Sequence, residues 1–179
     1  MEQDNPKQWY ALRVTYGREM TARNFFDEHG IRSFVPMKYE YIIRDRKKTR
    51  RLVPAVSNLI FVYEAKSQID HIKHTALPYL RYIMGKECGM TYPITISLTE
   101  MENFIRVASQ VEQDIRYVET PDYDFCEGEM VKVIAGPFAG SKGFLVKIKG
   151  TRHRRVVVGI EGLLQIATAV IPINWIERA

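Results

Sequence analysis

The run of mostly apolar residues at 9–16 predicts a strand. One face of this strand would carry Tyr10, Leu12, Val14 and Tyr16, and the other Trp9, Ala11, Arg13 and Thr15. Gly17 ends this pattern, and residues 18–30 then carry apolar side chains at the spacing of an amphipathic helix. Gly30 follows the helix where a C-terminal cap glycine belongs. The chain is therefore predicted to open with a strand and a helix that share one core.

A dense run of basic residues separates the next two apolar stretches. Residues 33–43 and 56–63 both read as strands, and "RDRKKTRR" (residues 44–51) lies between them with six basic residues and one acidic residue. We expect the two stretches to pair as a long hairpin, with the basic segment as its charged tip.

Two further helices are predicted from capping signals. Ser67 with Asp70 resembles a capping box, and the helix that follows should end before Pro78. Thr99 with Glu102 is a second such box, followed by an apolar stripe that extends to Ile115. Short strands lie between the helices, so residues 1–111 are predicted to form an α+β domain, an antiparallel sheet flanked by helices.

The periodicity changes from 3.6 to 2 after an acidic segment, residues 112–127, which carries six acidic residues and one arginine. Residues 128–179 alternate over short runs punctuated by glycine, as expected of a small closed all-β barrel. Their β-branched residues favour strands over helices. The predicted organisation is therefore an N-terminal domain at 1–111, a linker at 112–127 and a C-terminal domain at 128–179.

The glycine-rich stretch "VIAGPFAGSKGFLV" (residues 133–146) raises the question of a phosphate-binding loop. Its spacing is one residue short of the P-loop pattern, serine and lysine are in reversed order, and a strand pattern follows where a helix is required. We therefore interpret it as a constrained turn between two strands. The residues assigned to this turn are Gly136, Pro137, Phe138, Gly140 and Gly143.

The remaining composition argues for a binding protein. The 179 residues contain no catalytic motif, the four histidines are scattered, and Cys88 and Cys126 lie too far apart for metal-ligand spacing. We predict that the protein is not an enzyme and uses no cofactor or metal. The chain has no 18-residue apolar run and no secretory signal, so a cytoplasmic location without membrane association is expected.

Several stretches resemble the NusG and RfaH family of transcription factors. "WYALRVTYGREMTARNFF", "NLIFVY", "HTALPYLRYIMG" and "PITISLTEMENFI" are similar to the NusG N-terminal domain, and residues 128–150 resemble the KOW motif of SH3-like barrels. "LVPAVSNLIFV" and "GTRHRRVVV" most resemble the UpxY-type members that act on capsular polysaccharide operons. The resemblance covers residues 8–172, although Ser57 stands where many relatives have proline.

The resemblance implies an operon-specific transcription elongation and antitermination factor. Its N-terminal domain would bind the clamp helices of RNA polymerase and suppress pausing and termination. Partners would include the polymerase, the non-template DNA of the transcription bubble and, through KOW, the ribosome or termination factor; we expect a monomer. Two alternatives stay open, a housekeeping NusG factor and a KOW-type ribosomal RNA-binding protein.

The resemblance also assigns site residues by position. It assigns polymerase binding to four apolar strand residues that are expected to form one patch, namely Leu59, Phe61, Tyr82 and Met84. The alternative is that these residues are buried in the core. Nucleic-acid contacts fall on Arg18, Lys73, His74, Thr75 and Arg81. Because of its charge density we add the basic tip to these nucleic-acid contacts, namely Arg44, Arg46, Lys47, Lys48, Arg50 and Arg51. The alternative is that the tip is only a solvated hairpin end.

Overall fold

The computed structural model describes residues 6–118, 128–147, 153–160 and 163–179. Two compact units are formed by the chain, and each is described separately. The first contains Met1–Pro36 and Pro54–Leu98, and the second contains Met37–Val53 and Thr99–Ala179. The predicted domains, 1–111 and 128–179 with a linker at 112–127, have different boundaries from these two units and stay a prediction. Within the described ranges, no helix is long and apolar enough to cross a membrane.

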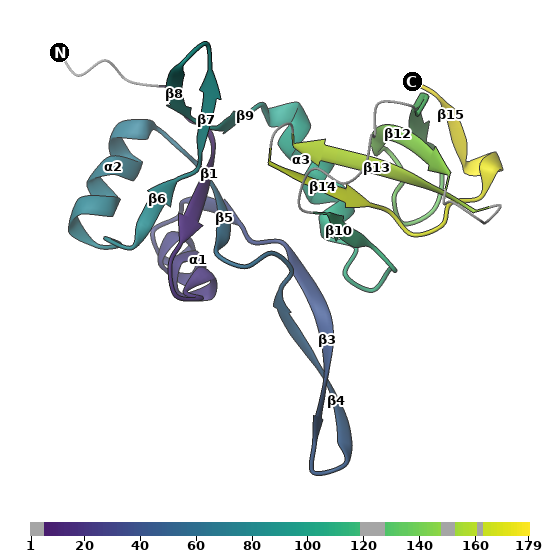
Figure 1. Cartoon of the computed structure of the whole chain (residues 1–179), viewed down its shortest axis with the longest axis horizontal. Coiled ribbons are helices and arrows are strands. Elements are labelled where there is room, and N and C mark those ends of the chain that lie inside the picture. Colours follow the sequence, from purple (N-terminus) through teal and green to yellow (C-terminus); the bar gives the residue numbers. More distant parts are fainter. Residues whose placement is uncertain (1–5, 119–127, 148–152, 161–162) are drawn as a thin grey trace. The chain divides into compact units, whose positions relative to one another are not determined.

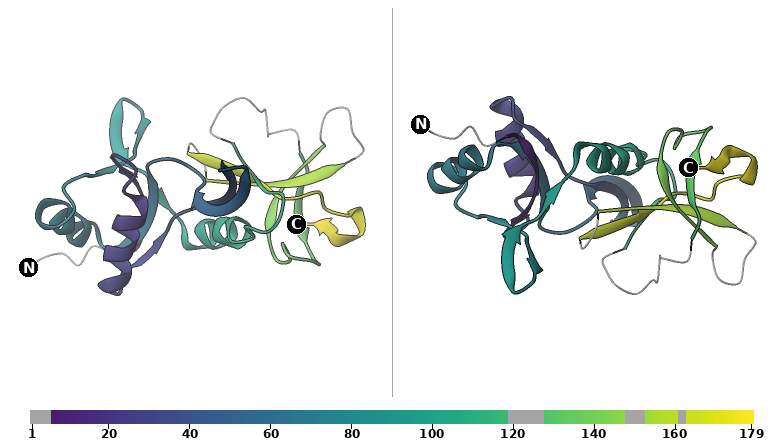
Figure 2. Two further views of the ribbon diagram at one scale, coloured as in Figure 1. Left: turned by 90° about the horizontal axis from the view of Figure 1, so that it is seen from below. Right: turned by 90° about the horizontal axis from the view of Figure 1, so that it is seen from above.

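An antiparallel sheet forms the centre of the first unit (Figures 1 and 2). Its order is β2-β5-β1-β6, and β9 also pairs with β1. The central strands are apolar on both faces, which explains why Trp9, Leu12, Ile60 and Phe61 are fully buried. The bounds are Gln8–Val14 for β1, Arg32–Phe34 for β2, Leu59–Glu64 for β5, Leu80–Tyr82 for β6 and Thr95–Ile96 for β9.

Two helices contribute apolar stripes to this unit. Helix α1, Glu19–Glu28, buries Ala22 and Phe26, and Gly30 follows it with φ +66°, as the sequence predicted. Helix α2, Lys66–Thr75, buries Ile69 and Ile72. The capping box predicted for α2 is wrong, because the helix begins after Ala65 with no side-chain cap. The Asp70 carboxylate instead accepts a hydrogen bond from Lys66.

The predicted long hairpin exists, but its second strand is the basic segment itself. Strand β3, Met37–Arg44, pairs with β4, Lys47–Pro54, while β5 pairs with β1 and β2. The physical reason is a two-residue turn at Asp45 and Arg46, which have φ values of +49° and +63°. The pairing we predicted between residues 33–43 and 56–63 survives only as the short β2–β5 ladder. Figure 1 draws β3 and β4 as one long twisted ribbon.

Helix α3, Leu98–Ala108, is shorter than the predicted stripe. Met101 and Phe104 are buried as expected, but the helix ends at Ala108, so Ile115 lies outside it. Thr99 lies inside the helix rather than at its cap, and the predicted box there is also wrong. A second small hairpin, formed by β7 (Met84–Glu87) and β8 (Met90–Pro93), precedes this helix in the first unit.

The C-terminal part of the second unit is a six-stranded antiparallel sheet in the order β10-β14-β13-β12-β11-β15. Its first strand comes from the segment predicted as linker, and no pairing between β10 and β15 is present in the described ranges. A closed KOW barrel therefore stays a prediction. The bounds are Arg116–Val118 for β10, Met130–Val133 for β11, Lys142–Lys147 for β12, Arg154–Ile160 for β13, Leu164–Ala167 for β14 and Ile176–Arg178 for β15.

The glycine-rich stretch forms the turn between β11 and β12. Gly136 and Gly140 have φ values of +78° and +87°, which explains their identity. Gly143, which we assigned to the turn, lies instead in β12, where it is required because a Cβ would lie 2.3 Å from the backbone oxygen of Val157. Phe138 is buried, as expected of a residue that covers a small core.

Candidate nucleic-acid and polymerase interface

Three arginines lie at the C-terminal end of β1, where the strand leads into α1. Arg13 and Arg81 are directly opposite each other on β1 and β6, and Arg18 follows in the next turn. All three are exposed, and within the described part of the chain none of them pairs with a carboxylate. Like charges in opposed strand positions are unfavourable, so this arrangement favours a negatively charged partner.

Two tyrosines accompany these arginines. The Arg18 guanidinium lies 4.9 Å from the ring centroid of Tyr79 and 5.8 Å from that of Tyr16. Tyr16 is 87% exposed and has φ +63°, an unfavourable conformation for a bulky residue. We call Arg13, Tyr16, Arg18, Tyr79 and Arg81 the β1-end cluster.

Sequence reasoning found Arg18 and Arg81 but missed the rest of the β1-end cluster. Tyr16 was placed on the apolar face of a strand, whereas β1 already ends at Val14. The adjacent Gly17, which also has a positive φ, was the signal that Tyr16 belongs to the turn. Arg13 could not be found this way, because its proximity to Arg81 depends on strand register.

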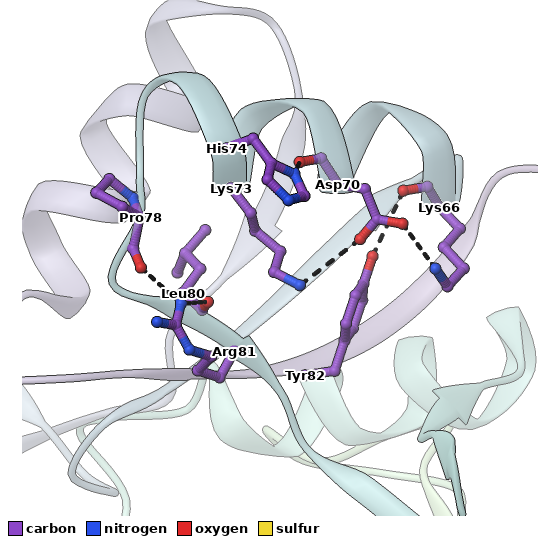
Figure 3. A network of polar contacts seen from close by, with 8 residues as sticks. All are labelled: Lys66, Asp70, Lys73, His74, Pro78, Leu80, Arg81 and Tyr82. Carbon is purple, nitrogen blue, oxygen red and sulfur yellow. Dashed lines mark hydrogen bonds and ion pairs between the residues drawn. The ribbon is translucent and has the colours of Figure 1, made fainter.

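The other predicted nucleic-acid residues lie in the last turns of α2, namely Lys73, His74 and Thr75. Figure 3 shows the first two of them. His74 Nδ1 lies 2.6 Å from the Asp70 backbone oxygen, and the Thr75 hydroxyl donates to the His71 carbonyl. Both of these side chains are exposed. Lys73 differs from them, since only 17% of its side chain is exposed.

Lys73 belongs to an internal network around Asp70. Its Nζ lies 3.6 Å from the Asp70 carboxylate and 4.1 Å from the ring centroid of Tyr82, while Lys66 Nζ binds the same carboxylate at 2.6 Å. Burial alone would raise the pKa of Asp70, but hydrogen bonds from Lys66 and Tyr82 and the two lysine charges outweigh it and hold that pKa below its ordinary value. The charge of Lys73 is thus largely used within the fold.

The four predicted polymerase-binding residues do not form one patch. Leu59 and Phe61 oppose Arg13 and Ala11 on β1, whereas Tyr82 opposes Leu12. Successive residues of a strand point to opposite faces, so Tyr82 lies on the other side of the sheet from Leu59 and Phe61. Our prediction of a common patch is wrong because it took β5 and β6 as neighbouring strands, whereas β1 lies between them.

Accessibility also divides these residues. Leu59 is 4% exposed and Phe61 is fully buried, as in the alternative of a core position. Tyr82 is half-buried, and burial followed by the nearby Asp70 charge raises its pKa well above the ordinary range. Met84 on β7 is 49% exposed and offers apolar surface. Of the four, Met84 is therefore the residue best able to contact a partner directly.

The β3–β4 hairpin carries a row of aromatic and cationic side chains on one face. Lys48 Nζ lies 4.1 Å from the ring centroid of Tyr41, and the Arg50 guanidinium lies 3.5 Å from that of Tyr39. We call these four residues the hairpin ladder. The remaining cations of the basic tip, Arg44, Arg46, Lys47 and Arg51, are exposed and belong to no ion pair in the described part of the chain.

The base of this hairpin is held by the segment that follows α3. Arg50 Nη2 donates to the Glu112 carboxylate at 2.7 Å, and the Tyr117 hydroxyl donates to the Met37 carbonyl at 3.3 Å. The bond from Arg50, together with one from Tyr39, lowers the pKa of Glu112 against a smaller effect of burial. Arg50 is therefore part of the attachment, and the cations nearer the turn are available to a partner.

No group of three or more potential metal-ligating His, Cys, Asp or Glu side chains occurs among the described residues. Cys88 is exposed as a free thiol, and Cys126 lies outside the described residues. The side chains described above offer charge, stacking and apolar contact.

Residues 7–105 match the family model described as NusG, "Transcription termination factor nusG". A solved structure described as "Domain interaction in Thermotoga maritima NusG" is similar at 21% identity, with 96% of this chain and 97% of that chain covered and a TM-score of 0.47. Among curated proteins, none matches the chain.

Proposed function

Because the chain belongs to the NusG family of transcription factors, we propose that it is an operon-specific elongation and antitermination factor. NusG proteins bind RNA polymerase, and the proposed contact here is with the clamp helices. Bound there in the cytoplasm, the protein would suppress pausing and termination. The operon-specific role, directed at capsular polysaccharide genes, rests on the resemblance of residues 52–62 and 150–158 to UpxY-type members.

The observation that best supports action on the transcription bubble is the β1-end cluster. Its three arginines carry unpaired positive charge, and Tyr16 presents an almost fully exposed ring. Arginine neutralises phosphate and an aromatic ring stacks on an unpaired base, so the displaced non-template DNA strand fits this surface. His74 and Thr75 would extend it from the end of α2. The KOW-type sheet is left to recruit a further partner, the ribosome or termination factor.

Polymerase binding is tested on Met84, since a charge at the buried Phe61 would test folding instead. The Met84→Asp variant should lose co-purification with core RNA polymerase, because an aspartate would be desolvated in an apolar contact. Met90→Asp is a matched control, since Met90 is 71% exposed on the other strand of the same hairpin. Equal binding of both variants would remove Met84 from the interface.

The operon-specific role needs a transcription assay. Pausing and terminator readthrough should be scored on templates with and without the DNA that flanks the protein's own gene. An operon-specific factor should raise readthrough only on the flanking template. An equal effect on both templates would instead identify a housekeeping elongation factor, and the Arg18→Ala, Arg81→Ala double variant should abolish the template preference.

A further inference from the structure

The exposed surface of the β3–β4 hairpin is not needed to build the fold. Every residue from Glu40 to Leu52 is exposed, so both faces of the ribbon are open to solvent. Tyr41 is 62% exposed and Ile43 is 75% exposed. A two-stranded ribbon without packing is only marginally stable in water, so its length is not explained by a contribution to the core. Exposed aromatic and apolar side chains on such an arm are typical of a surface that contacts a partner.

The charge of this arm identifies the partner as an anion. Residues 37–54 contain seven basic and two acidic residues, a net charge of +5. One acidic residue, Glu40, is already paired with Lys38 at 3.2 Å, which leaves the cations near the turn unneutralised. Four of the cations of this arm, Arg44, Arg46, Lys47 and Arg51, are exposed and belong to no ion pair in the described part of the chain, so they are available to phosphates.

The hairpin ladder restricts the partner further. The Tyr41 ring has a cation beside it and most of its surface exposed, which is the arrangement that stacks on an unpaired base. In a duplex the base faces are covered by their neighbours, so a stacking ring would gain nothing there. An acidic polypeptide would satisfy the cations but would leave the exposed ring without a role.

We propose that the β3–β4 hairpin binds single-stranded RNA, with Tyr41 stacking on a base at one face and Arg44, Arg46, Lys47 and Arg51, at the turn and on the other face, contacting phosphates. The proposal deepens the proposed function and rests on it for the choice of strand. A transcribing polymerase presents two single strands, and the displaced DNA strand is already assigned to the β1-end cluster. The hairpin is therefore assigned to the transcript, through contacts that need no particular sequence.

The test measures binding of the full chain, without polymerase, to a fluorescent oligonucleotide of about twelve nucleotides by anisotropy. Probes are single-stranded RNA, DNA of the same sequence, and the corresponding RNA duplex. Tyr41→Ala should weaken RNA binding by about 5- to 150-fold, and Tyr41→Trp should restore it. Replacing the four cations by glutamine should lower the salt slope for RNA by about 3.

Matched controls separate the two surfaces. Tyr92→Ala removes an exposed tyrosine from the other small hairpin and should leave RNA binding unchanged. Arg18→Ala with Arg81→Ala should weaken binding of DNA but not of RNA. The proposal is overturned if Tyr41→Ala leaves RNA binding intact, if it weakens DNA binding equally, if the duplex binds as tightly as the single strand, or if polyglutamate competes as well as RNA. Co-purification of these variants with RNA polymerase tests the proposed function separately.

Discussion

Arg155 is the buried charge that attaches β10 to the C-terminal sheet. Only 7% of this residue is exposed. One guanidinium nitrogen donates to the backbone oxygens of Asp114 and Thr168, both at 2.7 Å, and the other donates to the Asp114 carboxylate at 2.6 Å. Replacement by methionine keeps the length of the side chain and removes all three bonds. We expect Arg155→Met to destabilise the second unit and to release β10.

The size of the destabilisation expected for Arg155→Met follows from the surroundings of each hydrogen bond that is lost. The bond to Thr168 is buried and charge-assisted, which corresponds to about 1.5–3 kcal/mol. The Asp114 side chain is 67% exposed, so solvent screening reduces the ion pair to about 0.2–1 kcal/mol. Arg155→Met should therefore cost about 2–4 kcal/mol in the free energy of unfolding. Asp114→Asn keeps the backbone acceptor and should cost at most about 1 kcal/mol.

The contribution of the Asp114 carboxylate to the free energy of unfolding should also depend on pH. Hydrogen bonding from Arg155, opposed by a smaller effect of burial, lowers the pKa of Asp114 in the folded protein. The stabilisation is therefore complete above the unfolded pKa of about 3.9 and is lost as pH falls through the lower folded pKa. The difference between wild type and Asp114→Asn should shrink in acid, whereas the effect of Arg155→Met should persist because the bond to Thr168 does not titrate.

The assay needs a signal from the second unit alone. The chain has two tryptophans, so a Trp9→Phe background leaves Trp175 as the only one, and its fluorescence reports urea unfolding of the sheet. Equal destabilisation by Arg155→Met and Asp114→Asn would refute the dominance of the buried bond. A cost below about 0.5 kcal/mol for Arg155→Met would refute the role of Arg155 altogether.

Two further predictions concern the turn and α2. Gly136→Ala should cost about 2–5 kcal/mol, because the residue has φ +78° and its Cβ would lie 2.2 Å from the Trp175 ring; Gly89→Ala, with φ +82° and open space, controls for the backbone strain alone. Equal thermal shifts for these two variants would contradict the packing argument. Lys73→Ala should lower the free energy of unfolding by about 1 kcal/mol through its lost contacts with Asp70 and Tyr82. Arg81→Ala should reduce DNA binding, and its effect on stability should be limited to the loss of its hydrogen bonds to the Pro78 and Leu80 carbonyls.

Local patterns predicted most of the elements because their causes are local. The stripe that includes Ala22 and Phe26, together with Gly30, determined α1, and the positive-φ glycines Gly136 and Gly140 determined the turn in the C-terminal sheet. Their conformations depend on residues within a few positions of each other. For this reason the elements implied by the family resemblance agree with those predicted from local sequence patterns in these segments.

The errors arose where the outcome depends on contacts distant in sequence. The apolar spacing of α3 continues to Ile115, but the helix ends at Ala108 and Asp114 instead binds Arg155. The return strand of the hairpin was missed because "KKTRR" has low strand propensity and its turn uses Asp45 and Arg46 at positive φ, where glycine or asparagine is usual. Strand register likewise decided that Tyr82 and Phe61 lie on opposite faces.

The candidate site residues divide according to whether the fold already uses them. Lys73 and Tyr82 complete the Asp70 network and Phe61 is core, so changes there alter stability and binding together. Tyr41 is exposed beside Lys48, and the exposed Arg81 donates to the backbone carbonyls of Pro78 and Leu80 but pairs with no carboxylate in the described part of the chain, so their chemistry is available to a partner. A mutation scan of this protein would therefore mislead if it followed the family assignment alone. Exposure together with unpaired charge is the better guide, and it points to the β1-end cluster and to Tyr41 with the cations near it, Arg44, Arg46, Lys47 and Arg51.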